Sequence, residues 1–238
     1  MNMVYIGNAR ISEHGTVNGT RGDQTGREVM IQPWSQGGFW QYVFRPKSEA
    51  KAKKIAAAMA AACNNPNIGY SQRDRLSLDN LASKNGYKLD KVGKCNCDCT
   101  SLGAVCVNAA GIKVSPSMWS GNAHQLLSAT GQFTIFTSTS YTHAETKLRA
   151  GDILLRQGHM AIVTSGAVPF TQTTSTRTTK KKSTTAIAKE IIAGKCSDSR
   201  WKTWGYAPIR GRRLKKAGYT KAERKKIQDK VNELMRGN

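Results

Sequence analysis

The sequence predicts an α+β fold followed by a separate small helical domain. Three features indicate this: helical patterns dominate residues 48–131, segments dense in β-branched and aliphatic residues occupy residues 133–166, and a basic helical tail follows a low-complexity stretch. A run of helices followed by a run of strands is typical of an α+β arrangement. With 238 residues, the chain has room for one medium domain and one small domain.

The first part of the chain predicts irregular structure, then helices. Residues 1–47 are rich in Gly, Asn, Thr and Asp and favour loops, with short strands near residues 29–31 and 41–44. The segment "SEAKAKKIAAAMAAACNN" predicts a helix that Ser48 caps and that ends before Pro66. Further helices are expected at residues 74–83, from the cysteine cluster to residue 111, and at residues 121–131.

The second part predicts a small antiparallel sheet and then a change of domain. "FTIFTS" and "GDILLRQGHMAIVTSG" carry the residues that strands favour, and Gly158 marks a turn between two of them. Residues 171–185 have almost no apolar content. We therefore expect a domain large enough to hold a catalytic site at residues 1–173, a flexible linker at residues 174–185 and a basic domain of three short helices at residues 186–238.

The net charge of +22 and the pI near 10.0 indicate attraction to a polyanion, such as nucleic acid, an anionic membrane or an acidic wall polymer. The charge is concentrated in the tail, because residues 177–238 hold 19 Lys or Arg against 5 Asp or Glu. No stretch approaches the roughly 20 apolar residues that a membrane span needs. The first residues lack a basic segment followed by an apolar one, so we expect synthesis in the cytoplasm.

Four cysteines lie close together, at positions 95, 97, 99 and 106. Zinc sites need pairs of ligands separated by a longer loop, and this spacing does not provide two such pairs. Alternate residues of an extended chain also point in opposite directions, which makes them poor chelators. We therefore expect neither a metal site nor a cofactor, whereas the pairing of any disulfides stays open.

Cys99 differs from its neighbours because "DCTSLGAVCVNAAG" reads as a helix that Asp98 caps. A thiol in the first turn feels the positive end of the helix dipole and unpaired backbone amides, which favour the thiolate. The alternative is that Cys99 is one more small buried residue. Cys106, seven residues later and flanked by Ala and Val, is expected in the core.

A thiolate nucleophile usually needs an imidazole partner. Among the four histidines, His159 is the best candidate, because it opens the predicted strand "HMAIVTSG" directly after "AGDILL". A hairpin of these strands would place His159 at the rim of the sheet, where its side chain is able to face a neighbouring helix.

"DCTSL" at a helix start, followed some fifty residues later by "GDILLRQGHMAIV", resembles the NlpC-type cysteine peptidases, papain-like hydrolases of bacterial peptidoglycan. CHAP amidases share the order of Cys before His and are the nearest alternative. The resemblance implies a papain-like domain in which helices pack on a small antiparallel sheet. It implies that Cys99 is the nucleophile and that His159 is the general base, which later protonates the leaving amine.

The same resemblance implies further site residues. The third catalytic residue of the family falls near Thr171 or Gln172, and we choose Gln172. Tyr70 matches a tyrosine that contacts the substrate, and we place Asp98 beside it as a second contact. In the N-terminal loop, Asp23 and Gln24, together with Glu28, either line the substrate groove or simply build a turn.

The tail resembles the small three-helix wall-binding repeat of phage lysins over about residues 186–235. The resemblance implies contacts to muropeptide sugar and peptide from Trp204, Arg213 and Tyr219. The alternative is that the apolar residues of this segment form the core of the bundle, namely Leu214, Tyr219, Ile227, Val231 and Leu234.

Together the two resemblances describe a phage endolysin that would be made in the host cytoplasm without a signal peptide and released to the cell wall at lysis. Its expected partners are peptidoglycan and anionic wall polymers, not nucleic acid, and we expect a monomer. Family analogy favours cleavage of the γ-D-glutamyl–diamino acid bond, with an amidase cut between muramic acid and L-Ala as the alternative. Two rival hypotheses are a basic nucleic-acid-binding protein and a non-catalytic wall adaptor.

Overall fold

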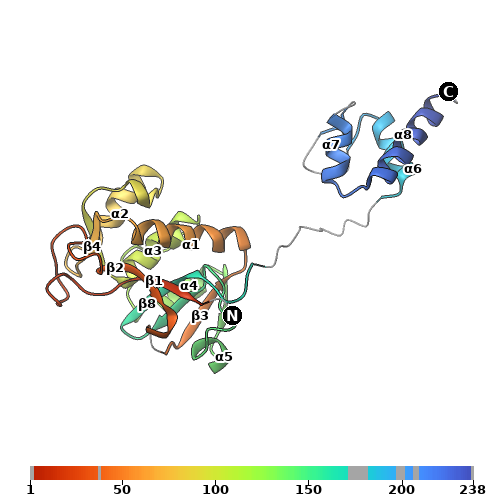
Figure 1. The fold of residues 1–238 in the computed structure, drawn as a ribbon. Coiled ribbons are helices and arrows are strands. Elements are labelled where there is room, and N and C mark those ends of the chain that lie inside the picture. The colour runs from red at the N-terminus through yellow and green to blue at the C-terminus, as the bar shows by residue number, and fades with distance from the viewer. Residues whose placement is uncertain (1–2, 37–38, 171–181, 197–201, 206–208, 237–238) are drawn as a thin grey trace. The chain divides into compact units, whose positions relative to one another are not determined.

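A six-stranded antiparallel sheet forms the centre of the first of two units in the computed structural model (Figure 1). The structure describes the chain except residues 1–2, 37–38, 171–181, 197–201, 206–208 and 237–238. The two units are Met1–Gln172 and Thr173–Asn238. The strands of the sheet are β1 (Tyr5–Ala9), β2 (Val29–Pro33), β3 (Tyr42–Pro46), β6 (Phe133–Phe136), β7 (Ile153–Arg156) and β8 (His159–Ser165).

The spatial order of the strands is β2-β1-β8-β7-β3-β6, and all neighbours are antiparallel. The sheet therefore combines strands from both ends of the unit: β1 pairs with β8, and Gly7 lies opposite Ile162. β7 and β8 form a tight hairpin in which Arg156 lies opposite His159. The two residues between them, Gln157 and Gly158, make the turn.

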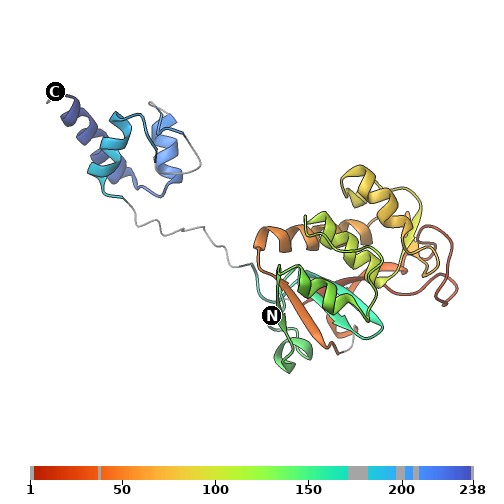
Figure 2. The same ribbon diagram turned by 180° about the vertical axis from the view of Figure 1, so that it is seen from behind.

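Two helices, α1 (Glu49–Cys63) and α3 (Cys99–Ala109), lie side by side on one face of the sheet (Figures 1 and 2). α1 is rich in alanine, and the side chain of Ser48 accepts a hydrogen bond from the Lys51 amide at its start, as the sequence predicts. The main hydrophobic core lies between these helices and the sheet and includes Ile55, Leu102 and Cys106. Cys106 is fully buried, which confirms its expected place in the core.

The opposite face of the sheet carries a second, smaller core. It contains Trp40, Ala161 and Val163, and the short helix α5 (Thr139–Thr142) adds Tyr141. The two faces of β8 thus contribute to two different clusters, as the alternation of side chains along a strand requires.

The remaining elements of the first unit surround the start of α3. β5 (Cys95–Cys97) pairs with β4 (Ile68–Tyr70) as a short parallel ladder. Cys95 and Cys97 are buried in this strand, so the part of the cysteine cluster before Asp98 is extended and the helix begins only at Cys99. The other helices and 3-10 turns are η1 (Trp34–Gln36), α2 (Ser77–Ala82), η2 (Ser83–Asn85), η3 (Leu89–Lys91) and α4 (Ala123–Ala129).

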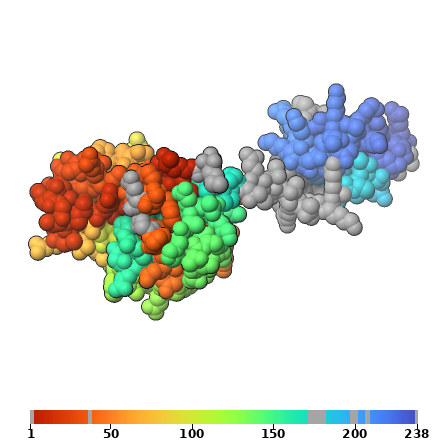
Figure 3. Space-filling model, turned by 60° about the horizontal axis from the view of Figure 1, so that its bottom comes forward, coloured from red at the N-terminus to blue at the C-terminus, as the bar shows by residue number. Residues whose placement is uncertain are grey.

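The fold is mixed α+β with an antiparallel sheet, in agreement with the predicted class. The sheet is larger than expected, because β1 was predicted as irregular structure yet lies between β2 and β8. In the space-filling view the N-terminal residues, coloured red, occupy one end of the surface of the first unit (Figure 3).

The described part of the second unit holds the helices α6 (Thr184–Ile192), α7 (Ile209–Lys216) and α8 (Lys221–Arg236). Buried side chains from these helices and from the segments between them form a small core of Ile187, Trp204, Leu214, Tyr219 and Ile227. Most of the predicted linker lies outside the described residues. Among the residues that are described, no helix is long and apolar enough to cross a membrane.

Candidate active site

The candidate site is built around the first turn of α3. Asp98 is the N-cap: its carboxylate accepts hydrogen bonds from the Ser101 amide at 2.7 Å and from the Thr100 hydroxyl at 3.1 Å. The Ser101 hydroxyl in turn accepts from the Asp98 amide at 2.9 Å, which completes a capping box. The predicted helix start is therefore confirmed, and Cys99 occupies the first helical position.

The Cys99 thiol is half-buried. Burial raises the pKa of this thiol to about 11, and the negative charge of Asp98 acts in the same direction. Hydrogen bonds from the backbone amides of Met160 and Thr100, and the positive charge of Arg75, lower it in part. In the resting structure the thiol is therefore protonated at neutral pH, although it lies among groups that stabilise the thiolate.

Met160 brings β8 and α3 together at this site. Its sulfur lies so close to Gly103 of α3 that a Cβ atom at that position would collide with it. Gly103 therefore permits the close approach of the helix to the strand. This contact holds the first turn of α3 against the start of β8, which is why the Met160 amide reaches the thiol.

His159, one residue earlier, points to the other face of the sheet. Its ring stacks on Trp40 with a centroid distance of 5.7 Å and an interplanar angle of 24°. Burial, together with the positive charges of Arg156 and Arg10, lowers the pKa of His159 to about 4. The imidazole is therefore neutral at pH 7 and able to accept a proton.

Cys99 and His159 thus reach the same end of the sheet without touching. The thiol contacts the backbone of Met160, the residue that follows His159. No hydrogen bond joins the two side chains in the described structure, because the strand's alternation directs the imidazole toward Trp40. This orientation differs from the expectation that His159 faces the neighbouring helix.

Tyr70 lies beside the thiol, at the end of β4 opposite Cys97. Burial raises the pKa of its hydroxyl, a hydrogen bond from Gln72 at 3.3 Å lowers it, and the nearby charges of Cys99 and Asp98 raise it. The structure therefore brings together three of the predicted residues, namely Tyr70, Asp98 and Cys99.

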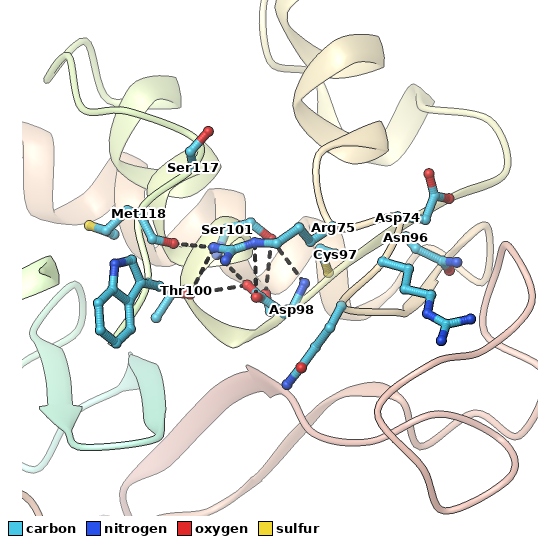
Figure 4. Close-up of polar contacts among 12 residues, drawn as sticks. Asp74, Arg75, Asn96, Cys97, Asp98, Thr100, Ser101, Ser117 and Met118 are labelled. Carbon is cyan, nitrogen blue, oxygen red and sulfur yellow. Dashed lines mark hydrogen bonds and ion pairs between the residues drawn. The ribbon is translucent and has the colours of Figure 1, made fainter. Parts of the chain in front are cut away.

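Arg75, which no sequence pattern singled out, ties this cluster together (Figure 4). Its guanidinium forms an ion pair with the Asp98 carboxylate at 3.0 Å and donates to the Thr100 hydroxyl at 3.1 Å. It also donates to the carbonyl of Met118, in the loop before α4. The Asp98 carboxylate is consequently engaged by the helix cap and by Arg75, so it holds the start of α3 in place, and a contact of Asp98 with substrate stays a prediction.

The N-terminal loop residues also have internal partners. The Asp23 carboxylate accepts hydrogen bonds from the amides of Thr25 and Gly26 at 3.0 and 2.7 Å, and the Gln24 side chain donates to the Gly22 carbonyl at 2.8 Å. Glu28 is buried and accepts from the amides of Gln24 and Tyr70 at 2.7 and 3.0 Å. These contacts favour the alternative in which this loop builds a turn.

The remaining predicted residues lie either outside the described part of the chain or in the second unit. Gln172, like Thr171, lies outside the described residues. In the second unit, Trp204 and Tyr219 are 2% and 6% exposed and form the small core, and the Arg213 guanidinium donates to the Thr203 carbonyl at 2.7 Å. The structure thus supports the core alternative for the two aromatic residues.

Metal ligands are not gathered in the described residues: no group of three or more His, Cys, Asp or Glu side chains is arranged to hold an ion. Cys63, Cys95, Cys97, Cys99 and Cys106 are thiols in the structure.

A helix-capped cysteine beside an antiparallel sheet of this kind is compatible with a hydrolase that uses a thiol. The model of the endolysin-like domain family matches residues 6–169, and the chain belongs to this family. The family description indicates a cell-wall lytic enzyme of the phage endolysin type. Neither the curated proteins nor the solved structures contain a significant match to the chain.

Proposed function

We propose that the protein is a peptidoglycan hydrolase that cleaves an amide bond of the stem peptide by acyl transfer to Cys99. The observation that carries this proposal is the position of the thiol, at the capped start of α3 and within reach of two backbone amides. Membership of the endolysin-like domain family supports the choice of substrate. The finer assignment to the NlpC type rests on the sequence resemblance.

In the proposed reaction, His159 acts as the general base. A rearrangement of the backbone at the start of β8 turns its neutral imidazole away from Trp40 and toward α3, where it accepts the thiol proton as the sulfur attacks the scissile carbonyl carbon. The backbone amide of Cys99, at the positive end of α3, stabilises the oxyanion that forms. This turn of the imidazole is required because the ring and the thiol do not touch in the resting structure.

Collapse of the tetrahedral intermediate breaks the carbon–nitrogen bond. The imidazolium gives its proton to the departing amine and leaves a thioester on Cys99. Water then attacks this thioester and gives a proton to His159, after which the carbon–sulfur bond breaks and the proton returns to the thiolate. Gln172 remains our proposal for the group that orients the imidazole, and Tyr70 for a substrate contact.

The bond we favour is the γ-D-glutamyl–diamino acid bond, and a cut between muramic acid and L-Ala is the alternative. Mass spectrometry of digested muropeptides separates the two, because the first leaves a new free amine on the diamino acid and the second leaves one on L-Ala. The basic second unit would hold the enzyme on anionic wall polymers through its charge.

The test is the variant Cys99→Ala, which should lose wall lysis and retain sedimentation with purified walls. Cys63→Ala is the matched control, since Cys63 is half-buried and hydrogen-bonds to Met59 of its own helix. Lysis by Cys99→Ala at the normal rate would show that the mechanism is wrong.

A further inference from the structure

Trp119 is an exposed aromatic side chain directly beside the candidate site. Its side chain is 55% exposed. One face of the indole lies on Gly121, so closely that a Cβ atom there would collide with the ring. An exposed indole held in one place in this way offers a rigid apolar face for a ligand.

The backbone of Trp119 is fixed at the start of α4. Its amide donates to the Asn122 side chain at 2.9 Å, and its carbonyl accepts from the amides of Asn122 and Ala123 at 3.0 and 2.9 Å. The indole is therefore presented by a preorganised turn, and binding would cost little additional ordering.

Arg75 connects this turn to the nucleophile. One nitrogen of its guanidinium donates both to the Thr100 hydroxyl and to the Met118 carbonyl, and these two residues are the immediate chain neighbours of Cys99 and Trp119 (Figure 4). The turn that carries the exposed indole is thereby tied to the first turn of α3, where the thiol lies.

We infer that Trp119 is a platform for a sugar ring of the substrate, the N-acetylmuramic acid that carries the stem peptide. This inference rests on the proposed function. The axial C–H groups of a pyranose form an apolar face that packs on an indole and removes both from water.

Two residues separate muramic acid from the favoured bond. A sugar on Trp119 would direct this short peptide segment toward the first turn of α3, to which Arg75 ties the turn that carries Trp119.

The test compares two ligands in the inactive Cys99→Ala background of the full chain. Calorimetry would measure the affinity for a soluble disaccharide-peptide and for the same stem peptide without sugar. Adding Trp119→Ala should weaken binding of the disaccharide-peptide by roughly tenfold and leave the free peptide unchanged. Trp119→Phe should recover part of the loss.

Leu81→Ala is the matched control, because Leu81 is an exposed apolar side chain on α2 and should change neither affinity. Equal losses for both ligands would overturn the inference and indicate that the indole contacts the peptide, and no loss would overturn it as well. The proposed function fails on a different result, namely lysis by the Cys99→Ala variant itself.

Discussion

The guanidinium of Arg75 lies 3.0 Å from the carboxylate of Asp98, the residue that caps α3 and precedes the thiol. Both partners are largely buried: the Arg75 side chain is 21% exposed and the Asp98 side chain 9%. The pair therefore links the electrostatics of the thiol to the integrity of the helix start. The same arginine holds the loop that carries Trp119.

Replacing Arg75 with Gln should raise the pKa of the Cys99 thiol further, because the positive charge of Arg75 is one of the influences that lower it. The variant should also cost about 2 kcal/mol of stability, since it leaves a buried carboxylate without its ion-pair partner. The measurement is the rate of Cys99 alkylation by iodoacetamide from pH 7 to 11, followed by peptide mass spectrometry.

Arg75→Lys keeps the charge and should retain most of the alkylation profile. Lys91→Gln, which removes an exposed ion pair with Asp90, should leave the profile unchanged. If the profile of Arg75→Gln matched that of the unaltered protein, Arg75 would have no electrostatic role at the thiol.

Stability of the first unit should fall as the pH drops below about 6.5. His159 has a folded-state pKa of about 4, below the ordinary value of 6.5, so the unfolded chain binds the proton more readily between these values. The contribution of the neutral imidazole to stability is fully present above pH 6.5 and is lost progressively toward pH 4. At pH 4.5 the loss of stability amounts to about 2–3 kcal/mol.

Denaturant unfolding at pH 7.5 and pH 4.5 would measure this effect. His159→Phe, which preserves an aromatic ring against Trp40, should lose less stability on acidification than the unaltered protein does. His14→Gln is the control, since His14 is exposed. An identical loss in His159→Phe would place the acid sensitivity elsewhere.

In the second unit, substitutions of core residues should lower stability, whereas substitutions of exposed lysines should weaken binding to cell walls. Trp204→Ala should cost about 3–4 kcal/mol and remove helical signal, because Trp204 is 2% exposed and donates to Glu190 at 2.9 Å.

The double variant Lys221→Gln/Lys226→Gln should keep its helices and sediment less with purified walls. Added salt should weaken wall binding of the unaltered protein in the same way.

Circular dichroism and sedimentation at two salt concentrations provide both readouts. Normal helicity in Trp204→Ala would contradict its place in the core. Salt-independent sedimentation would show that charge does not drive the association.

The local start of α3 could be predicted from the sequence, because a cap is decided by neighbouring residues. Asp98 followed by Ser101 contains the whole capping box. The β7–β8 hairpin could be predicted for the same reason, from two apolar runs around Gly158. The position of β1 could not, because this strand is defined by its partners, and one of them, β8, lies at the far end of the first unit in the sequence.

Which residues form the candidate site also depends on contacts between segments that are far apart in the sequence. Arg75 stands in a charged segment with no periodic pattern, and only the fold reveals that it reaches Asp98, Thr100 and Met118. The stacking of His159 on Trp40 likewise depends on which face of β8 each residue occupies. In the second unit, the need of a small bundle for large apolar side chains explains why Trp204 and Tyr219 are buried.

The pairing of β1 with β8, in which Tyr5 lies opposite Ser165, has a consequence for synthesis. The central ladder of the sheet joins the two extremes of the first unit, so it cannot close until nearly the whole unit has left the ribosome. During translation α3, which carries Cys99, is made before β8, the strand on which it packs. A lytic activity that depends on this sheet therefore cannot arise on an incomplete chain.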